Sequence, residues 1–140
     1  MSMSMSAMCV IGCDGYLGQF IAREGEGTYA RVYAMGRRRA RERDHDDGEG
    51  DYYAHDDDPT TTTMVRVGGV DVTSHTSCVE AMTRAYDDAM RRGVRIAMVV
   101  NCAAVSSPGA CERAPDVALA VNAPREAWRA TREVARMRGC

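Results

Sequence analysis

Apolar segments of strand length alternate with amphipathic segments along most of the chain. Four segments have the length and apolar content of strands: 7–11, 30–35, 64–72 and 94–100. Segments with apolar residues at helical spacing follow Gly15, follow Ser77 and begin again near Pro115. Because strands that alternate with helices usually pair in parallel, this pattern predicts an α/β fold with a doubly wound parallel sheet.

The spacing of apolar residues also predicts where the helices lie and which faces they bury. The first helix is expected to bury Leu17, Phe20 and Ile21. A loop is expected around Pro108. The helical pattern near Pro115 should break at Ala123, because the following Pro124 disfavours helical backbone before it.

The second helix carries the clearest start and stop signals. Ser77 and Glu80 stand in capping-box register, and two arginines followed by Gly93 indicate the end of the helix. The face it buries is expected to comprise Val79, Met82, Tyr86 and Met90.

Two of the strand segments predict how their side chains are distributed. In the second segment Val32 and Ala34 alternate with Arg31 and Tyr33, which is typical of a half-buried strand. Residues 94–100 contain the continuous apolar run Ile96-Ala97-Met98-Val99-Val100, as expected for a central parallel strand covered on both faces.

The segment between the second and third strands is strongly polar. Five arginines lie in 37–43 and nine acidic residues in 42–58. Residues 40–63 are therefore predicted to be a disordered acidic insertion, with too few apolar groups to offset the entropy of ordering. His45 and His55 could bind a cation there, but a solvated charged loop is the preferred interpretation. The net charge of −2 gives no indication of a nucleic-acid partner.

The remaining composition bears on compartment. Residues 1–6 are expected to be a disordered tail without a targeting signal, so that 7–140 form the predicted domain. No apolar run is long enough to cross a membrane. Six cysteines without C-x-x-C pairs fit a reducing compartment. We therefore expect a cytoplasmic protein with no membrane partner and no metal.

One strand-to-helix connection carries the main indication of function. The sequence Val-Ile-Gly-Cys-Asp-Gly-Tyr-Leu-Gly has glycines at every third position. Gly12 is expected to end the strand in a tight turn, Gly15 to let the backbone approach a pyrophosphate, and Gly18 to let the helix pack closely on the sheet. The amides of Tyr16 and Leu17 would then bind the pyrophosphate at the helix N-terminus. The chain is predicted to bind a dinucleotide, the alternative being an ordinary strand-to-helix turn.

Two arginines at the end of the second strand bear on the kind of dinucleotide. Arg37 and Arg38 stand where NAD-binding folds carry an acidic residue for the ribose hydroxyls. Guanidinium groups suit the extra phosphate of NADP, which a carboxylate would repel. NADP is therefore preferred and NAD is the second choice. The alternative is that these arginines only balance the acidic segment that follows.

Short segments further along the chain resemble a known family. Asp71 and Val72 follow the third strand, and Asn101-Cys102-Ala103-Ala104 ends the fourth. Cys111 to Asp116 and Val121-Asn122 match a helix that begins through Glu-x-x-Pro and bears an Asn-containing turn. With the G-x-x-G-x-x-G spacing, residues from about 8 to the C-terminus resemble the extended short-chain dehydrogenase/reductase family. The resemblance is to the dTDP-4-dehydrorhamnose reductase branch, which includes the regulatory β subunit of methionine adenosyltransferase.

The resemblance implies a Rossmann-like fold with strand order 3-2-1-4 and assigns roles to these residues. It implies that Asp71 and Val72 lie at the adenine ring and that Cys102, Ala103 and Ala104 line the cofactor ribose. The alternatives are that Asp71 only begins a helix and that Asn101 only caps a strand end. Asn122 is expected to be structural.

The resemblance also implies hydride transfer between NADP and a nucleotide-sugar substrate, with a Tyr-x-x-x-Lys pair as the catalytic group. The chain contains no lysine, so this pair is absent from it. We therefore expect the N-terminal, NADP-binding portion of a dTDP-4-dehydrorhamnose reductase-like oxidoreductase, with an incomplete sheet whose fourth strand is an unprotected edge. The alternatives are a regulatory subunit that binds a synthetase and a truncated remnant without function.

Overall fold

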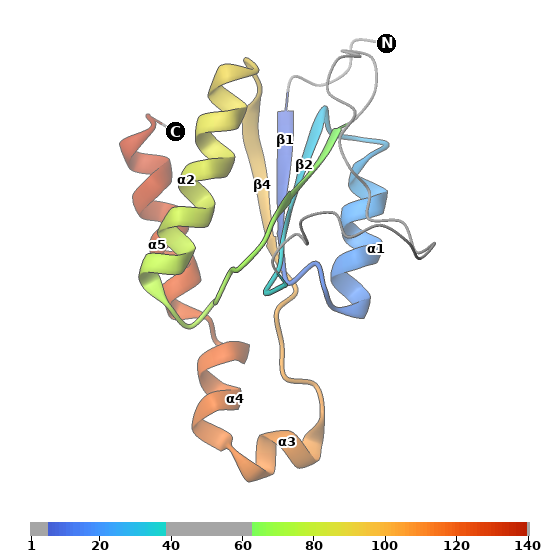
Figure 1. Ribbon diagram of the computed structural model, residues 1–140, viewed down its shortest axis with the longest axis vertical. Helices are drawn as coiled ribbons and strands as arrows, with labels where there is room; N and C mark the ends of the chain where they lie inside the picture. Colours follow the sequence, from blue (N-terminus) through green and yellow to red (C-terminus); the bar gives the residue numbers. More distant parts are fainter. Residues whose placement is uncertain (1–5, 39–62, 140) are drawn as a thin grey trace, which may run out of the picture.

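Figure 1 shows a parallel sheet flanked by helices, in a computed structural model that describes residues 6–38 and 63–139. The strands are β1 (Ser6–Ile11), β2 (Arg31–Met35), β3 (Thr63–Val67) and β4 (Arg95–Asn101). The helices are α1 (Tyr16–Gly25), α2 (His75–Arg91), α3 (Pro108–Arg113), α4 (Pro115–Asn122) and α5 (Arg125–Met137). All strand pairs are parallel, in the order β3-β2-β1-β4. The predicted α/β class, doubly wound sheet and order 3-2-1-4 are confirmed, and the open sheet corresponds to an incomplete Rossmann-like fold.

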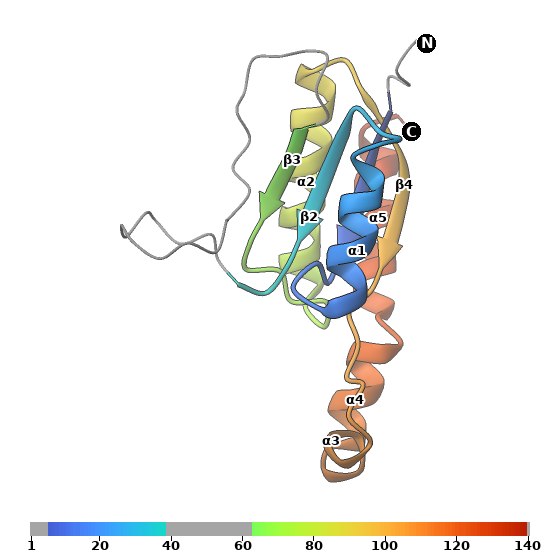
Figure 2. The same ribbon diagram turned by 90° about the vertical axis from the view of Figure 1, so that its right-hand side faces the viewer.

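The sheet lies between two unequal layers of helix. Figure 2 shows α1 on one face and α2 with α5 on the other. In β1, Ala7, Cys9 and Ile11 point into the larger core with α2 and α5. Met8 and Val10 point into the smaller core under α1. Because both faces are covered, this strand is apolar at nearly every position.

The buried face of α1 differs from the prediction. Its buried residues are Gly18, Ala22 and Gly25, whereas Leu17 and Phe20 are 60% and 48% exposed. Ile21 is half-buried against the smaller core. A Cβ at Gly18 would overlap the carbonyl oxygen of Gly12, so the glycine side of the helix is the one that touches the strand end. Small residues, not large ones, set the orientation of this helix.

The start of α2 also differs from the prediction. Ser74 is the N-cap, and its Oγ accepts a hydrogen bond from the Ser77 amide at 3.3 Å. The start predicted from a capping box at Ser77 was therefore wrong by about one turn. The predicted end of the helix is confirmed, since Gly93 follows the C-cap with a φ of +67°. Val79 is half-buried and Met90 is exposed, and the buried face consists mainly of smaller side chains: Cys78, Ala81, Met82, Ala85, Tyr86 and Ala89.

Two strand predictions were wrong. All five residues of β2 are buried, Arg31 and Tyr33 included, because Asp88 on α2 accepts hydrogen bonds from Arg31 Nε and the Tyr33 hydroxyl, each at 2.9 Å. β4 is not a central strand, since no described strand pairs with its outer edge and Met98 is 46% exposed. The expectation of an edge strand holds for the described part of the sheet. β3 ends at Val67 and is shorter than predicted.

The chain after β4 forms one more helix than the sequence indicated. The segment expected to be a loop around Pro108 is α3, which Ser107 caps by accepting a hydrogen bond from the Ala110 amide at 3.4 Å. The predicted boundary is confirmed, since α4 ends at Asn122 and Ala123 is its C-cap. Residues 1–5 of the predicted tail and 40–62 of the predicted insertion, with His45 and His55, lie outside the described residues. Ser6 and Thr63, the last residue of each predicted segment, begin β1 and β3 instead. Among the described helices, none combines the length and apolarity needed to cross a bilayer.

Candidate functional site

The glycine turn after β1 is held by contacts that leave no room for a side chain at Gly12 or Gly18. Gly12 has φ +81°, a conformation that favours glycine. The amides of Gly12 and Cys13 donate to the Met35 carbonyl oxygen at 2.8 and 3.0 Å, which fixes the turn against the end of β2. A Cβ at Gly18 would lie 2.9 Å from the Cys13 Cα. The close helix–sheet approach predicted for these glycines is present.

The turn leads directly into an open helix N-terminus. Gly15 is the N-cap of α1 and offers no side-chain cap, and the first turn of the helix holds no acidic residue. No hydrogen bond joins the amides of Tyr16, Leu17 and Gly18 to another described residue. Amides in this position carry the positive end of the helix dipole and bind anions. The site can therefore accept a phosphate from the solvent side.

Gly15 differs from the other two glycines of the motif. A Cβ at this position would meet nothing closer than the Gly12 carbonyl oxygen at 3.5 Å, an ordinary contact. Its φ is −84°, which any residue adopts. The folded chain thus has room for a side chain at Gly15, so the absence of one is not required by packing.

The carboxyl ends of the strands bring a second segment to the turn. Ile11 pairs with Met35 on one side and with Asn101 on the other, so β1, β2 and β4 end at one level. The Cys102 amide donates to the Ile11 carbonyl oxygen at 2.7 Å. A Cβ at Gly12 would lie 2.7 Å from the Ala103 Cα. The segment predicted to line the ribose therefore forms the wall beside the glycine turn, with Cys102 and Ala103 half-buried and Ala104 exposed.

This wall lies at the point where the connections from two neighbouring strands lead to opposite faces of the sheet. The chain leaves β1 for α1 on one face and leaves β4 for α5 on the other, as Figures 1 and 2 show. In open α/β sheets, ligands bind at the carboxyl ends of two strands whose connections diverge in this way. The topology and the glycine motif therefore indicate the same place.

The end of β2 forms the second part of the site. Arg37 and Arg38, predicted to bind the adenosine phosphate, are exposed just after β2. The Asp14 carboxylate extends from the glycine turn, accepts the Arg38 amide at 3.1 Å and pairs with the Arg66 guanidinium of β3. A Cβ at Gly36 would overlap this carboxylate. Burial opposes ionisation of Asp14, but the Arg38 hydrogen bond and the Arg66 charge outweigh it and lower the pKa of Asp14.

Asp14 and Arg66 were missed in the sequence. Arg66 also approaches the Cys13 Sγ from Nη1, at 3.7 Å. One signal was present: Arg66 is the only charged residue in the apolar segment 64–70. Its partner could not be identified there, because Asp14 lies 52 residues earlier in the chain.

The residues predicted at the adenine ring lie after β3. One carboxylate oxygen of Asp71 accepts the Thr73 amide at 2.9 Å and the Thr73 hydroxyl at 2.7 Å. These two bonds, and to a smaller extent the charge of Arg37, lower the pKa of Asp71. Val72 is 8% exposed and belongs to the larger core. Asp71 therefore forms a local turn before α2 and stays exposed near Arg37.

Two further predicted residues make local contacts near the end of β4. Asn101 Oδ1 accepts the Ala103 amide at 3.3 Å. Asn122 on α4 pairs with both polar groups of Val105, accepting its amide at 2.7 Å and donating to its carbonyl oxygen at 3.1 Å. Asn122 thus joins α4 to the segment that follows Ala103 and Ala104.

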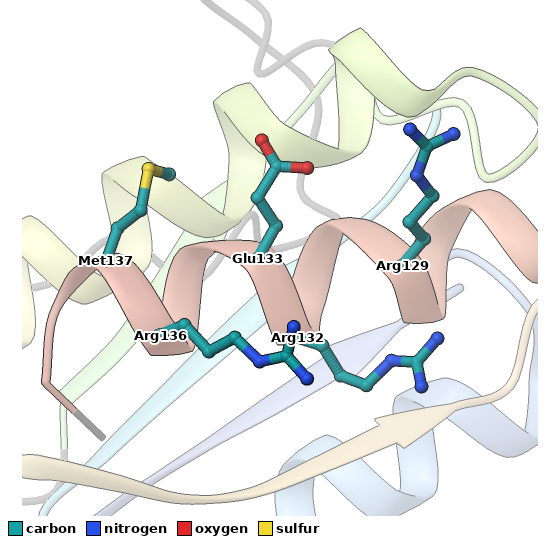
Figure 3. A pocket seen from close by; sticks show the side chains of 5 residues that line it. All are labelled: Arg129, Arg132, Glu133, Arg136 and Met137. Carbon is teal, nitrogen blue, oxygen red and sulfur yellow. The ribbon is translucent and has the colours of Figure 1, made fainter.

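A concavity of about 460 Å³ lies elsewhere, on α5. Figure 3 shows its lining side chains, all from that one helix: Arg129, Arg132, Glu133, Arg136 and Met137. It shares no residue with the glycine turn. In the described ranges, no group of three His, Cys, Asp or Glu side chains is placed to hold a metal ion.

Comparisons of the chain with protein-family models, with curated proteins and with solved structures found no match.

Proposed function

We propose that this chain binds a dinucleotide, NADP in preference to NAD, as the cofactor-binding portion of a dTDP-4-dehydrorhamnose reductase-like oxidoreductase acting on a nucleotide sugar. The observation that carries the proposal is Gly15. It lies between Gly12 and Gly18, which packing requires to be glycines, yet Gly15 itself is free of that requirement. A ligand that approaches the backbone closely explains the glycine at position 15, and a pyrophosphate is the group that such turns bind.

Three parts of the dinucleotide have a proposed counterpart in the site. The amides of Tyr16 and Leu17 would hold the pyrophosphate, and Ala103 with Ala104 would line a ribose. Arg37 and Arg38 would bind the adenosine phosphate, since both are exposed at the end of β2. NADP would supply the hydride chemistry. The proposal for this chain is limited to binding, because the sequence holds no lysine for a Tyr-x-x-x-Lys pair. A cytoplasmic location is part of the proposal.

Titration of the full chain with NADPH and NADH tests the proposal. The fluorescence of the nicotinamide reports binding, and thermal unfolding gives a second readout. At about 100 times the dissociation constant, bound coenzyme adds about 2.7 kcal/mol to the free energy of unfolding. Absence of binding and of any thermal shift with both coenzymes would overturn the proposal.

Gly15→Ala separates a ligand contact from a packing contact. The variant should fold like the wild type, because the added methyl meets only an ordinary contact, and should bind NADPH at least about tenfold more weakly, a loss of about 1.4 kcal/mol. Gly27→Ala is the matched control, since a Cβ there lies 3.9 Å from the nearest atom, at the other end of α1. Equal NADPH affinity in the two variants would contradict the role given to Gly15.

A further inference from the structure

The carboxylate of Asp14 lies at the end of β2, where dinucleotide-binding folds usually place an acidic residue of the strand end itself. In dinucleotide-binding folds an acidic residue about 20 positions after the glycines, at the end of the second strand, binds the ribose hydroxyls of NAD. Here that strand end carries Gly36, Arg37 and Arg38 instead. Asp14 reaches the same place from the glycine turn, against Gly36 and the Arg38 amide.

The neighbourhood of this carboxylate keeps it charged and accessible. Asp14 and Arg66 form an ion pair, and their side chains are 21% and 32% exposed. The pair is therefore at the surface of the site and not inside the core. Among the residues that the structure describes, the pairing neutralises one of three guanidinium groups at this end of the site, the others being those of Arg37 and Arg38.

The two coenzymes respond to such a carboxylate in opposite ways. The ribose diol of NAD can donate hydrogen bonds to it, whereas the phosphate of NADP is repelled by it and would compete with it for Arg66. The lack of a side chain at Gly36 is required for the carboxylate to lie there, because a Cβ on Gly36 would overlap it.

We propose that Asp14 determines the specificity between NADP and NAD, an inference that rests on the proposed dinucleotide site. Through its pairing with Arg66 it limits the preference for NADP that Arg37 and Arg38 create. The wild-type chain then still prefers NADP, but by a smaller margin than Arg37 and Arg38 alone would give. Removal of the negative charge ends the repulsion of the phosphate and widens the preference for NADP.

The test compares dissociation constants for NADPH and NADH in the full-length wild type and in Asp14→Asn. Asparagine retains an acceptor for the Arg38 amide and removes the charge. The ratio of the NADH to the NADPH dissociation constant should rise about tenfold, as expected for one charge beside a phosphate. Glu24→Gln removes an exposed carboxylate from the far end of α1 and should leave the ratio unchanged.

Arg66→Gln gives an independent measurement should Asp14→Asn fail to fold. Loss of this guanidinium removes the ion pair with Asp14 and leaves its negative charge to repel the phosphate. NADPH affinity should therefore fall at least about fivefold more than NADH affinity. A folded Asp14→Asn whose ratio stays within about twofold of wild type overturns the inference, as does equal loss of both coenzymes in Arg66→Gln. Binding of neither coenzyme by the wild type refutes the dinucleotide site itself, which is a different result.

Discussion

Gly12 and Ala103 lie in direct backbone contact across the carboxyl ends of β1 and β4, with no space for a side chain at Gly12. Gly12 also has φ +81°. Gly12→Ala therefore combines a strained backbone with a collision, and should lower the free energy of unfolding by about 2–4 kcal/mol. Urea unfolding followed by circular dichroism measures the difference. Gly27→Ala is the control and should change the free energy by less than about 1 kcal/mol. A Gly12→Ala variant as stable as this control would show that the contact is not close.

Asp88 should make a pH-dependent contribution to stability. It accepts hydrogen bonds from Arg31 and Tyr33, both buried. Asp88→Asn should therefore lower the free energy of unfolding at neutral pH by about 2 kcal/mol. Burial opposes ionisation of Asp88, but these partners and Arg91 outweigh it and lower its pKa.

The sign of the pH effect follows from the lowered pKa. The stabilisation is present above the unfolded-state pKa of about 3.9 and is lost as the pH falls through the folded-state value. The difference between wild type and Asp88→Asn should therefore narrow between about pH 5 and about pH 2. Glu80→Gln, on the exposed side of the same helix, should have the same free energy of unfolding as the wild type at both ends of this pH range. A constant difference across the range would exclude a role for the charge.

Asn122 should protect the Val105 amide from hydrogen exchange. The two residues share two hydrogen bonds, of 2.7 and 3.1 Å. In Asn122→Ala both are lost, and the Val105 amide should exchange at least about tenfold faster, corresponding to about 1.4 kcal/mol of local stability. Asn122→Asp keeps the acceptor for this amide and should retain most of the protection. Equal protection in all three proteins, measured by exchange and mass spectrometry, would contradict the anchoring role.

The sequence predicted the fold class where local signals are strong. Gly93 and Pro124 mark helix ends through their backbone preferences, which act without tertiary contacts. The orientation of α1 was not predictable in the same way. Hydrophobic spacing favours Leu17 and Phe20 as the buried face, but the contact with the strand end selects Gly18, which hydrophobicity does not register.

The candidate site was predictable only where its residues are adjacent in sequence. The glycine turn and the two arginines after β2 follow from local motifs. The ion pair of Asp14 with Arg66 joins residues 52 positions apart, and the bond of Arg31 to Asp88 joins residues 57 positions apart. A charged residue within an apolar segment indicates that a partner exists, but only the three-dimensional structure shows which residue provides it.

The buried thiols should react only very slowly with alkylating reagents at neutral pH. Burial raises the pKa of Cys13 and Cys78 to about 11, and the pKa of Cys9 is raised further by the same cause. Because the thiolate is the reactive form, at pH 8 only about one in a thousand thiols of pKa 11 is ready to react. The half-buried Cys111 should therefore be alkylated by iodoacetamide well before these three, and urea should abolish the difference.

Peptide mass spectrometry resolves this order, because it assigns each label to its own cysteine. Labelling of the slow thiols should also rise about tenfold per pH unit between pH 7 and pH 9, since their thiolate fraction is far from saturation. Cys111→Ser removes the fast label from its peptide without altering the slow group. If Cys9 or Cys78 were labelled as fast as Cys111 in the native chain, the core between the sheet and α2 would have to open far more often than its packing allows, because both side chains are almost completely buried in it.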